Sequence, residues 1–213
     1  VEGPWVTVVG ARDAHATSLE ASALLCEALA RRGLGVLSGG ALGVDSAAAE
    51  ATLACGGRVA AMLPGGLDQL EPRSNRLLFQ RILEAGGLLL SEQPAPRRPR
   101  AWVYHRRNEL MVALARAVVV VQAGLPSGSA VTGSHALRLG RPLFVLPPVW
   151  ERAEFAGNAA LLERGARGLW QVAQLERGLD ALGLGLPSST RAPEAARATP
   201  QDPLLAALQG GPW

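Results

Sequence analysis

A glycine-rich corner, LSGGALGVDSAAAEA at residues 37–51, joins an apolar run to a segment fit for a helix. Gly39 and Gly40 allow a tight turn and a close backbone approach to a ligand, and Gly43 allows close helix packing. At such a corner, free backbone N–H groups and the positive end of the helix dipole favour an anion. Asp45 can cap the helix or hold a ligand hydroxyl. The corner predicts binding of an anion or a nucleotide phosphate, with a purely structural turn as the alternative.

A second polar turn, Ser127-Gly128-Ser129 continuing to Thr132, follows another apolar run and offers hydroxyl and amide groups. Because parallel strands of one sheet end at the same edge, we expect this turn to lie beside the glycine-rich corner. The spacing of the corner does not match G-x-G-x-x-G, so a dinucleotide fingerprint is a poor description. The two turns together predict one shared pocket.

A basic segment, RRPRAWVYHRR at residues 97–107, has no acidic residue between Glu92 and Glu109. Arginines interleaved with planar rings are typical of surfaces for single-stranded nucleic acid, where cations contact phosphates and rings stack on bases. The alternative is a solvated loop whose rings fold into the body of the protein. The possible DNA contacts in this segment are Arg97, Arg98, Arg100, Trp102, Tyr104, Arg106 and Arg107.

Hydrolytic and metal chemistry find little support in the sequence. There is no G-x-S-x-G or H-E-x-x-H motif, and His15, His105 and His135 lack ligand spacing. Cys26 and Cys55 form no C-x-x-C pair and fall in apolar helical patterns, so both are expected in the core. We therefore expect no catalytic residue, no metal site and no cofactor.

Short Val/Leu-rich runs alternate with Ala/Leu/Glu/Arg-rich segments along most of the chain, which predicts an α/β fold. Uninterrupted apolar runs such as 118–121 favour a mostly parallel sheet of at least six strands with helices on both faces. Thr17 and Glu20 have the spacing of a capping box at the start of the first helix. The expected strands are 5–10, 35–38, 58–63, 87–91, 117–123 and 142–148, with helices that include 44–55, 76–84 and 107–115, and helical patterns in 158–170 and 172–182.

One main domain is expected over residues 1–183, followed by a Pro/Ala-rich linker or tail over 184–213. Within that tail, DPLLAALQGGPW resembles the start of a truncated winged helix. No apolar run approaches about 18 residues and no signal peptide is evident, so a cytoplasmic protein without a membrane segment is expected. The net charge of +3 permits nucleic-acid partners without requiring them.

Eight ordered motifs between residue 5 and about residue 166 resemble those of the DNA-processing protein A family, also called Smf. The resemblance implies an extended Rossmann-like fold that binds single-stranded DNA, dimerises and helps to load a RecA-type recombinase in natural transformation, without catalysis. The motifs are VTVVGAR, VLSGGALGVDSAAAEATL, GGLDQLEPRSN, GGLLLSE, RRNELMVALARAVVVVQA, SGSAVT, GRPLFVLP and NAALLERGA.

The resemblance and the two turns together define the expected phosphate-binding site. The chain departs from the family at three places: Leu42 and Glu109 stand where arginines are usual, and Ala48 where a histidine is usual. Losing two cations and gaining an anion weakens a groove of charge-assisted contacts, each worth roughly 1.5–3 kcal/mol. The residues of the expected site are Gly10, Arg12, Ser38, Gly39, Gly40, Gly43, Asp45, Arg107, Asn108, Ser127, Gly128 and Ser129.

Two alternatives come from the wider superfamily. The LOG-type phosphoribohydrolases carry a catalytic glutamate in P-G-G-x-G-T-x-x-E, but here the aligned segment PSGSAVT places Thr132 at that position. A noncatalytic sensor of a nucleotide-derived small molecule is the stronger alternative. Leu42 and Glu109 favour that sensor, whereas the basic segment 97–107 favours DNA.

Overall fold

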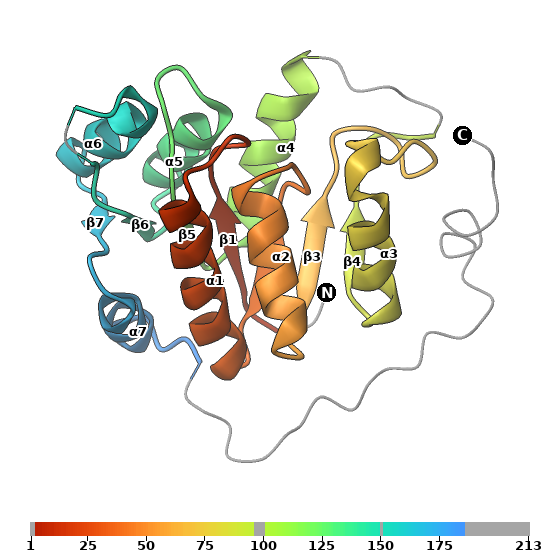
Figure 1. Ribbon diagram of the computed structural model, residues 1–213, viewed down its shortest axis with the longest axis horizontal. Coiled ribbons are helices and arrows are strands. Elements are labelled where there is room, and N and C mark those ends of the chain that lie inside the picture. The colour runs from red at the N-terminus through yellow and green to blue at the C-terminus, as the bar shows by residue number, and fades with distance from the viewer. Residues whose placement is uncertain (1–2, 96–100, 150, 186–213) are drawn as a thin grey trace.

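A single parallel sheet organises the chain. The computed structural model describes residues 3–95, 101–149 and 151–185, and within them seven strands pair in the order β4-β3-β2-β1-β5-β6-β7 (Figure 1). Every pair is parallel, and the strand order reverses direction between β1 and β5. The predicted α/β, Rossmann-like class is therefore confirmed. The strands are β1 (Trp5–Val9), β2 (Gly35–Ser38), β3 (Val59–Met62), β4 (Leu88–Leu90), β5 (Ala117–Val120), β6 (Leu143–Val145) and β7 (Arg167–Gly168).

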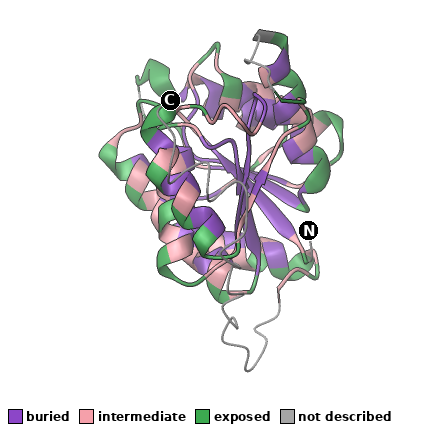
Figure 2. Cartoon of the chain, turned by 90° about the vertical axis from the view of Figure 1, so that its right-hand side faces the viewer, coloured by how far each residue is buried: buried purple, intermediate pink, exposed green. Residues whose placement is uncertain are grey.

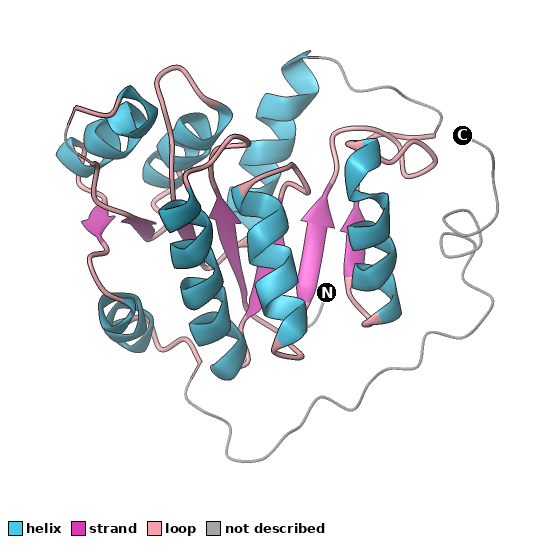
Figure 3. Ribbon diagram, in the orientation of Figure 1, coloured by secondary structure: helices cyan, strands magenta, loops and turns pink. Residues whose placement is uncertain are grey.

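Helices cover both faces of the sheet, as predicted (Figure 3). On one face α1 packs against α2 and α7, and α2 packs against α3. On the other face α5 packs between α4 and α6. The helices are α1 (Ala16–Arg31), α2 (Val44–Ala54), α3 (Arg76–Glu84), α4 (Ala101–Leu114), α5 (Gly128–Arg138), α6 (Ala156–Glu163) and α7 (Val172–Ala181), with short 3-10 turns η1 (Arg73–Asn75) and η2 (Ala153–Phe155).

Side chains that alternate along the central strands fill both cores. In and just after β5, Val118 and Val120 pack toward α4 and α5, whereas Val119 and Val121 pack toward α1, and all four are fully buried. Each such valine contributes about 1.5–3 kcal/mol of transfer free energy. Figure 2 shows the buried strands between helices whose outer faces are exposed. The buried sheet gives the loops at its carboxyl edge a rigid base.

Two expectations about helix starts are wrong. Helix α4 begins at Ala101 rather than near residue 107, because the last proline before it is Pro99 and nothing in the intervening sequence breaks a helix. Consequently, the second half of the basic segment is helical and not a loop. The capping box at Thr17 and Glu20 does not form, because α1 starts at Ala16 with no side-chain cap.

Two further expectations are corrected near the ends of elements. Cys26 is buried as predicted, but Cys55 is exposed because it is the C-terminal cap of α2, beyond the last packed turn. The helical pattern predicted up to Trp170 ends at α6, where Gly165 adopts a positive φ of 97°, and the chain then adds the edge strand β7. The sheet of at least six strands that was predicted therefore has seven strands within the described residues, because β7 adds to its edge.

The described chain continues just past the expected domain boundary, since Leu184 packs against the core formed with α1. The predicted linker and winged-helix start lie outside the described residues from position 186 onward. Within the described residues, no helix combines the length and the apolar character needed to cross a bilayer.

Candidate functional site

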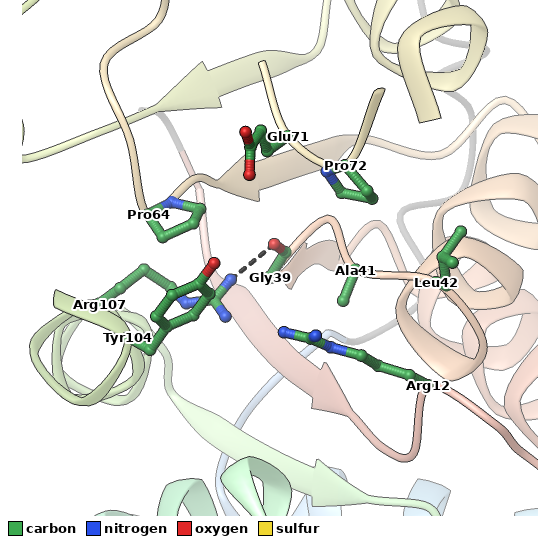
Figure 4. A pocket seen from close by; sticks show the side chains of 9 residues that line it. All are labelled: Arg12, Gly39, Ala41, Leu42, Pro64, Glu71, Pro72, Tyr104 and Arg107. Atoms are coloured by element: carbon green, nitrogen blue, oxygen red, sulfur yellow. Dashed lines mark hydrogen bonds between the residues drawn. The ribbon is translucent and has the colours of Figure 1, made fainter. Parts of the chain in front are cut away.

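The loops that follow β1, β2 and β5 meet at the carboxyl edge of the sheet and form two adjacent pockets. Arg12, Ala41, Tyr104 and Arg107 line both pockets, so the two form one groove. The smaller pocket, about 130 Å³, is shown in Figure 4 and is completed by Gly39, Leu42, Pro64, Glu71 and Pro72. The larger, about 320 Å³, is completed by Val9, Gly10, Ala11, Asp45, Asn108, Met111, Ser127, Gly128, Ser129 and Thr132.

The glycine-rich corner after β2 has the backbone that its sequence requires. Gly40 and Gly43 have φ values of 66° and 75°, in the left-handed region that favours glycine. A Cβ on Gly43 would lie 2.3 Å from the carbonyl oxygen of Ala11, so the corner packs directly on the loop after β1. Gly40 and Gly43 thus shape the groove without lining it.

Asp45 accepts hydrogen bonds from two backbone amides of the glycine-rich corner. Its Oδ2 accepts hydrogen bonds from the backbone N–H groups of Gly39 at 3.0 Å and Ala41 at 3.4 Å. These two amides are therefore not open to a ligand, contrary to the expectation that the corner binds an anion through its amides. Asp45 lies in the first turn of α2 but folds back on the corner, and Gly43 is the helix N-cap.

Arg107 reaches across the sheet to hold the same corner. Its Nη1 donates to the carbonyl oxygens of Gly39 at 2.6 Å and Met62 at 2.9 Å, and the residue is only 9% exposed. Burial raises the pKa of Asp45, and the positive charge of Arg107 opposes that rise. Burial likewise lowers the pKa of Arg107, with Asp45 opposing. Because arginine stays protonated in proteins, Arg107 acts as a fixed internal counter-charge for Asp45.

Asn75 is a third support of the corner that the sequence analysis did not single out. Its Nδ2 donates to the carbonyl oxygens of Gly40 at 2.9 Å and Ala41 at 3.1 Å, and to Ser46 Oγ at 2.9 Å. The sequence did contain a signal, since Asn75 ends the motif GGLDQLEPRSN, but its position in the turn before a helix gave no indication of its hydrogen-bond partners. The corner is therefore bound by Asp45, Asn75 and Arg107 together.

The start of α5 supplies the open amides that the corner lacks. Ser127 is the N-cap and accepts from the N–H of Ala130, while Ser129 Oγ donates to the carbonyl of Gly10 at 2.8 Å. Asn108 Nδ2 donates to the carbonyl of Gly128 at 3.2 Å, which fixes the turn on α4. Within the described chain the N–H groups of Gly128 and Ser129 have no acceptor, and both residues line the larger pocket. Two free amides at a helix N-terminus favour an anion.

Two guanidinium groups lie close to one aromatic ring in the groove. The Cζ atoms of Arg12 and Arg107 each lie 6.0 Å from the ring centroid of Tyr104, within cation–π range (Figure 4). Arg12 is exposed, and within the part of the chain that the structure describes it has no hydrogen bond or ion pair. Glu71, also exposed, lines the smaller pocket. Arg12 thus presents its guanidinium group to the groove without a carboxylate partner among the described residues.

Helix α4 divides the predicted basic segment between two surfaces. Tyr104 and Arg107 face the groove, whereas Trp102, 56% exposed, and Arg106 line neither pocket. Arg106 instead pairs with Glu92 at 3.1 Å. Residues 97, 98 and 100, expected to add DNA contacts, lie outside the described residues.

The three residues that differ from the usual family pattern, Leu42, Ala48 and Glu109, have different surroundings in the structure. Leu42 is 44% exposed and lines the smaller pocket, whereas Glu109 lies outside both pockets and pairs with Arg138. Ala48 is fully buried inside α2, and Ser38 is buried at the end of β2 without lining a pocket. Within the described residues, no group of three His, Cys, Asp or Glu side chains could hold a metal ion.

A parallel sheet whose polar groove lies at its carboxyl edge, beside the reversal in strand order, defines the class of Rossmann-like proteins. Comparison with known proteins specifies this class further. The chain belongs to the family described as DNA recombination-mediator protein A, whose sequence model matches residues 1–179. The sequence resemblance to the DNA-processing protein A family is therefore confirmed.

Relatives and solved structures support the same assignment. The chain is 39% identical over 190 residues to Protein Smf of Escherichia coli (strain K12), covering 89% of this chain and 50% of that protein. DNA processing protein A from Helicobacter pylori, solved for insight into its single-stranded DNA binding mode, matches with a TM-score of 0.76 and 34% identity, covering 84% and 80% of the two chains. The protein from Streptococcus pneumoniae matches with a TM-score of 0.74 and 29% identity, covering 82% and 61%. The chain spans about half the length of the curated relatives it matches.

Proposed function

We propose that this chain binds single-stranded DNA along the groove at the carboxyl edge of the sheet. The observation that carries the proposal is the pairing, in one groove, of the unpaired cation Arg12 with the two free amides of Gly128 and Ser129. Phosphate contacts of this kind supply affinity without reading sequence. The family assignment and the DNA-binding relative from Helicobacter pylori support the same ligand.

Each part of the groove has a distinct role in this proposal. One phosphate lies at the start of α5 and is neutralised by Arg12, while a nucleobase stacks at Tyr104 or enters the larger pocket beside Val9 and Met111. Asp45, Asn75 and Arg107 position the corner rather than contact the DNA backbone. Asp45 Oδ2, Asn75 Nδ2 and Arg107 Nη1 already form hydrogen bonds with the corner. A prepositioned groove avoids part of the ordering cost of binding.

The role we propose is binding rather than catalysis. The start of α5 carries no carboxylate where the phosphoribohydrolases have their glutamate: counted without a gap from Pro126, that position is Ser134 rather than Thr132, whose hydroxyl donates to the carbonyl of Gly128 at 3.0 Å. The carboxylate that does line the larger pocket, Asp45, is engaged with two backbone amides.

The family resemblance extends the proposal beyond the groove. We propose that residues 1–183 act as one DNA-binding unit, that two copies associate, and that the bound strand is passed to a RecA-type recombinase in the cytoplasm during transformation or recombination. Single-stranded DNA held by its backbone in an open groove keeps its bases accessible for that transfer.

A nucleotide-derived small molecule is the second candidate ligand. It is favoured by the volume of the larger pocket, about 320 Å³, and by Leu42 on the neighbouring wall where a cation would serve a long polyanion better. Competition separates the two candidates. A mononucleotide that displaces labelled oligothymidine at micromolar concentration supports the sensor, whereas displacement only by longer oligonucleotides supports DNA.

The decisive experiment is fluorescence anisotropy of labelled oligothymidine at several salt concentrations. We expect the affinity to fall as salt rises, with a slope of roughly 0.7 per phosphate contacted. Arg12→Ala should weaken binding by roughly tenfold, the value of one charge-assisted contact. Arg116→Ala is the matched control, because Arg116 is exposed just before β5, at the opposite edge of the sheet. The absence of binding, or equal effects of the two substitutions, would refute the proposal.

A further inference from the structure

A network of side chains with alternating charges runs along the outer side of α4 and α5. Arg106 Nε lies 3.2 Å from both carboxylate oxygens of Glu92, and its Nη1 lies 3.6 Å from Glu109. Glu109 also accepts from Arg138 at 2.8 Å, and Arg138 lies 2.8 Å from His135 Nδ1. These five residues come from the loop after β4 and from α4 and α5, so they connect three parts of the fold.

The charges of the four ionised side chains in this network cancel at neutral pH. Two guanidinium groups, on Arg106 and Arg138, face two carboxylates, on Glu92 and Glu109, which gives a net charge of zero. The hydrogen bond from Arg138 lowers the pKa of Glu109, so that carboxylate stays ionised. Burial, followed by the charge of Arg138, lowers the pKa of His135, which keeps the imidazole neutral. Among the described residues, this network therefore adds no net positive charge to this side of α4, and net positive charge is what attracts a nucleic-acid backbone.

The same side of α4 otherwise has the composition of a nucleic-acid surface. Trp102, Arg106 and Glu109 have the i, i+4, i+7 spacing of one helix face, and Trp102 is 56% exposed. An exposed indole can stack on a base, and arginine can contact a phosphate. The side chains of Arg106 and Arg138 are held in place by ion pairs with carboxylates and not by packing in the core, since both are about half exposed.

We infer that Glu109 weakens the binding of single-stranded DNA to the face of α4 and α5 beside the groove, because it neutralises Arg138 and, together with Glu92, Arg106. The inference rests on the proposed DNA-binding function and identifies a residue that sets affinity and the number of phosphates contacted. Glu109 is a positioning residue in this role, since it acts through its ion pairs with Arg106 and Arg138 and does not itself contact the DNA.

The test is Glu109→Gln, which removes the charge but keeps the size and the hydrogen-bonding capacity of the side chain. We expect the affinity for oligothymidine to rise roughly tenfold, as one charge-assisted contact is gained. The salt dependence should steepen by roughly 0.7 for each phosphate newly contacted. Glu84→Gln is the matched control, because Glu84 lies in α3 on the opposite face of the sheet and makes the same change in net charge.

A second variant identifies the source of any gain. Adding Arg106→Gln and Arg138→Gln to Glu109→Gln should return the affinity and the salt slope to the original values. Thermal melting of each variant checks that the fold is intact, and exposed pairs of this kind contribute little to stability.

The possible results separate this inference from the proposed function. DNA binding by the natural chain with no gain in Glu109→Gln, or an equal gain in Glu84→Gln, overturns the inference and leaves the groove proposal standing. No binding by the natural chain but binding by Glu109→Gln supports the inference and overturns DNA binding as the natural function. Absence of binding in both chains overturns both.

Discussion

Replacing Arg107 by methionine should destabilise the protein strongly, although the side chain lines the groove at the carboxyl edge of the sheet. Methionine preserves the length and helix propensity of the side chain in α4 but removes both donated hydrogen bonds and the counter-charge. The carbonyls of Gly39 and Met62 then lose this buried donor, while Asp45 keeps its two backbone hydrogen bonds but loses the nearby positive charge. Each buried acceptor that loses its donor costs about 1–3 kcal/mol, and the loss of the counter-charge adds to this cost. Against a total stability of about 5–15 kcal/mol, this loss is readily measured by urea unfolding.

The pH dependence of this loss provides a second, independent check. Without Arg107, the pKa of Asp45 should rise further above its ordinary value of 3.8, because burial is then unopposed. A carboxyl group whose pKa is raised in the folded state lowers the free energy of unfolding when the pH is above that pKa. This loss of stability disappears as the pH falls toward the ordinary pKa of the unfolded chain. The difference between the variant and the natural chain should therefore narrow on acidification from pH 7.

The double substitution Arg107→Met/Asp45→Asn, together with the two single substitutions, forms a double-mutant cycle that measures the interaction between these residues. It removes both charges, so it should be more stable at pH 7 than Arg107→Met alone, with a coupling energy of about 0.5–3 kcal/mol. A loss below about 1 kcal/mol for Arg107→Met at pH 7, or a loss that is independent of pH, would refute the assignment of Arg107 as the internal counter-charge.

Three further predictions test other supports of the fold. Asn158→Ala should cost about 2–4 kcal/mol in urea unfolding, because this fully buried amide makes three hydrogen bonds to the loops after β5 and β6; a cost below 1 kcal/mol would contradict that role. Gly43→Ala should cost more than Gly140→Ala, since both have positive φ but only Gly43 has backbone atoms within 3 Å of an added Cβ; equal losses would show that the close approach is unimportant. In thiol titration with a disulfide reagent, the exposed Cys55 should react in the native protein, while Cys26, whose pKa burial raises to about 12, should react only after unfolding; prompt reaction of both thiols would contradict the burial.

The sheet was predictable because its signal is local. Runs such as Val118–Val121 indicate a strand buried on both faces, and the glycines at positions 39, 40 and 43 indicate a turn, without knowledge of any partner. The start of α4 was missed because clustered charges suggested a solvated loop, whereas the helix requires only the absence of a breaker after Pro99.

The supports of the site were not predictable from spacing, because they act over long distances in the sequence. Asn75 bonds to Gly40, 35 residues away, and Asn158 bonds to Val121, 37 residues away. The use of the corner amides by Asp45 was also hidden, since the sequence places Asp45 at a helix start without showing that its carboxylate folds back. The sequence thus indicates where the groove lies but not which of its polar atoms are still free.

The bonds from Arg107 also set the order in which the groove can form during synthesis. The arginine follows Gly39 by 68 residues and Met62 by 45, so the corner is translated long before its donor. A nascent chain that contains only β1, β2 and β3 therefore holds these carbonyls without their cation. Because loops of this length must close before such contacts form, the corner reaches its final geometry only after α4 has emerged from the ribosome and docked. The final geometry of the groove is therefore reached late in biogenesis, even though the glycines of the corner are translated well before Arg107.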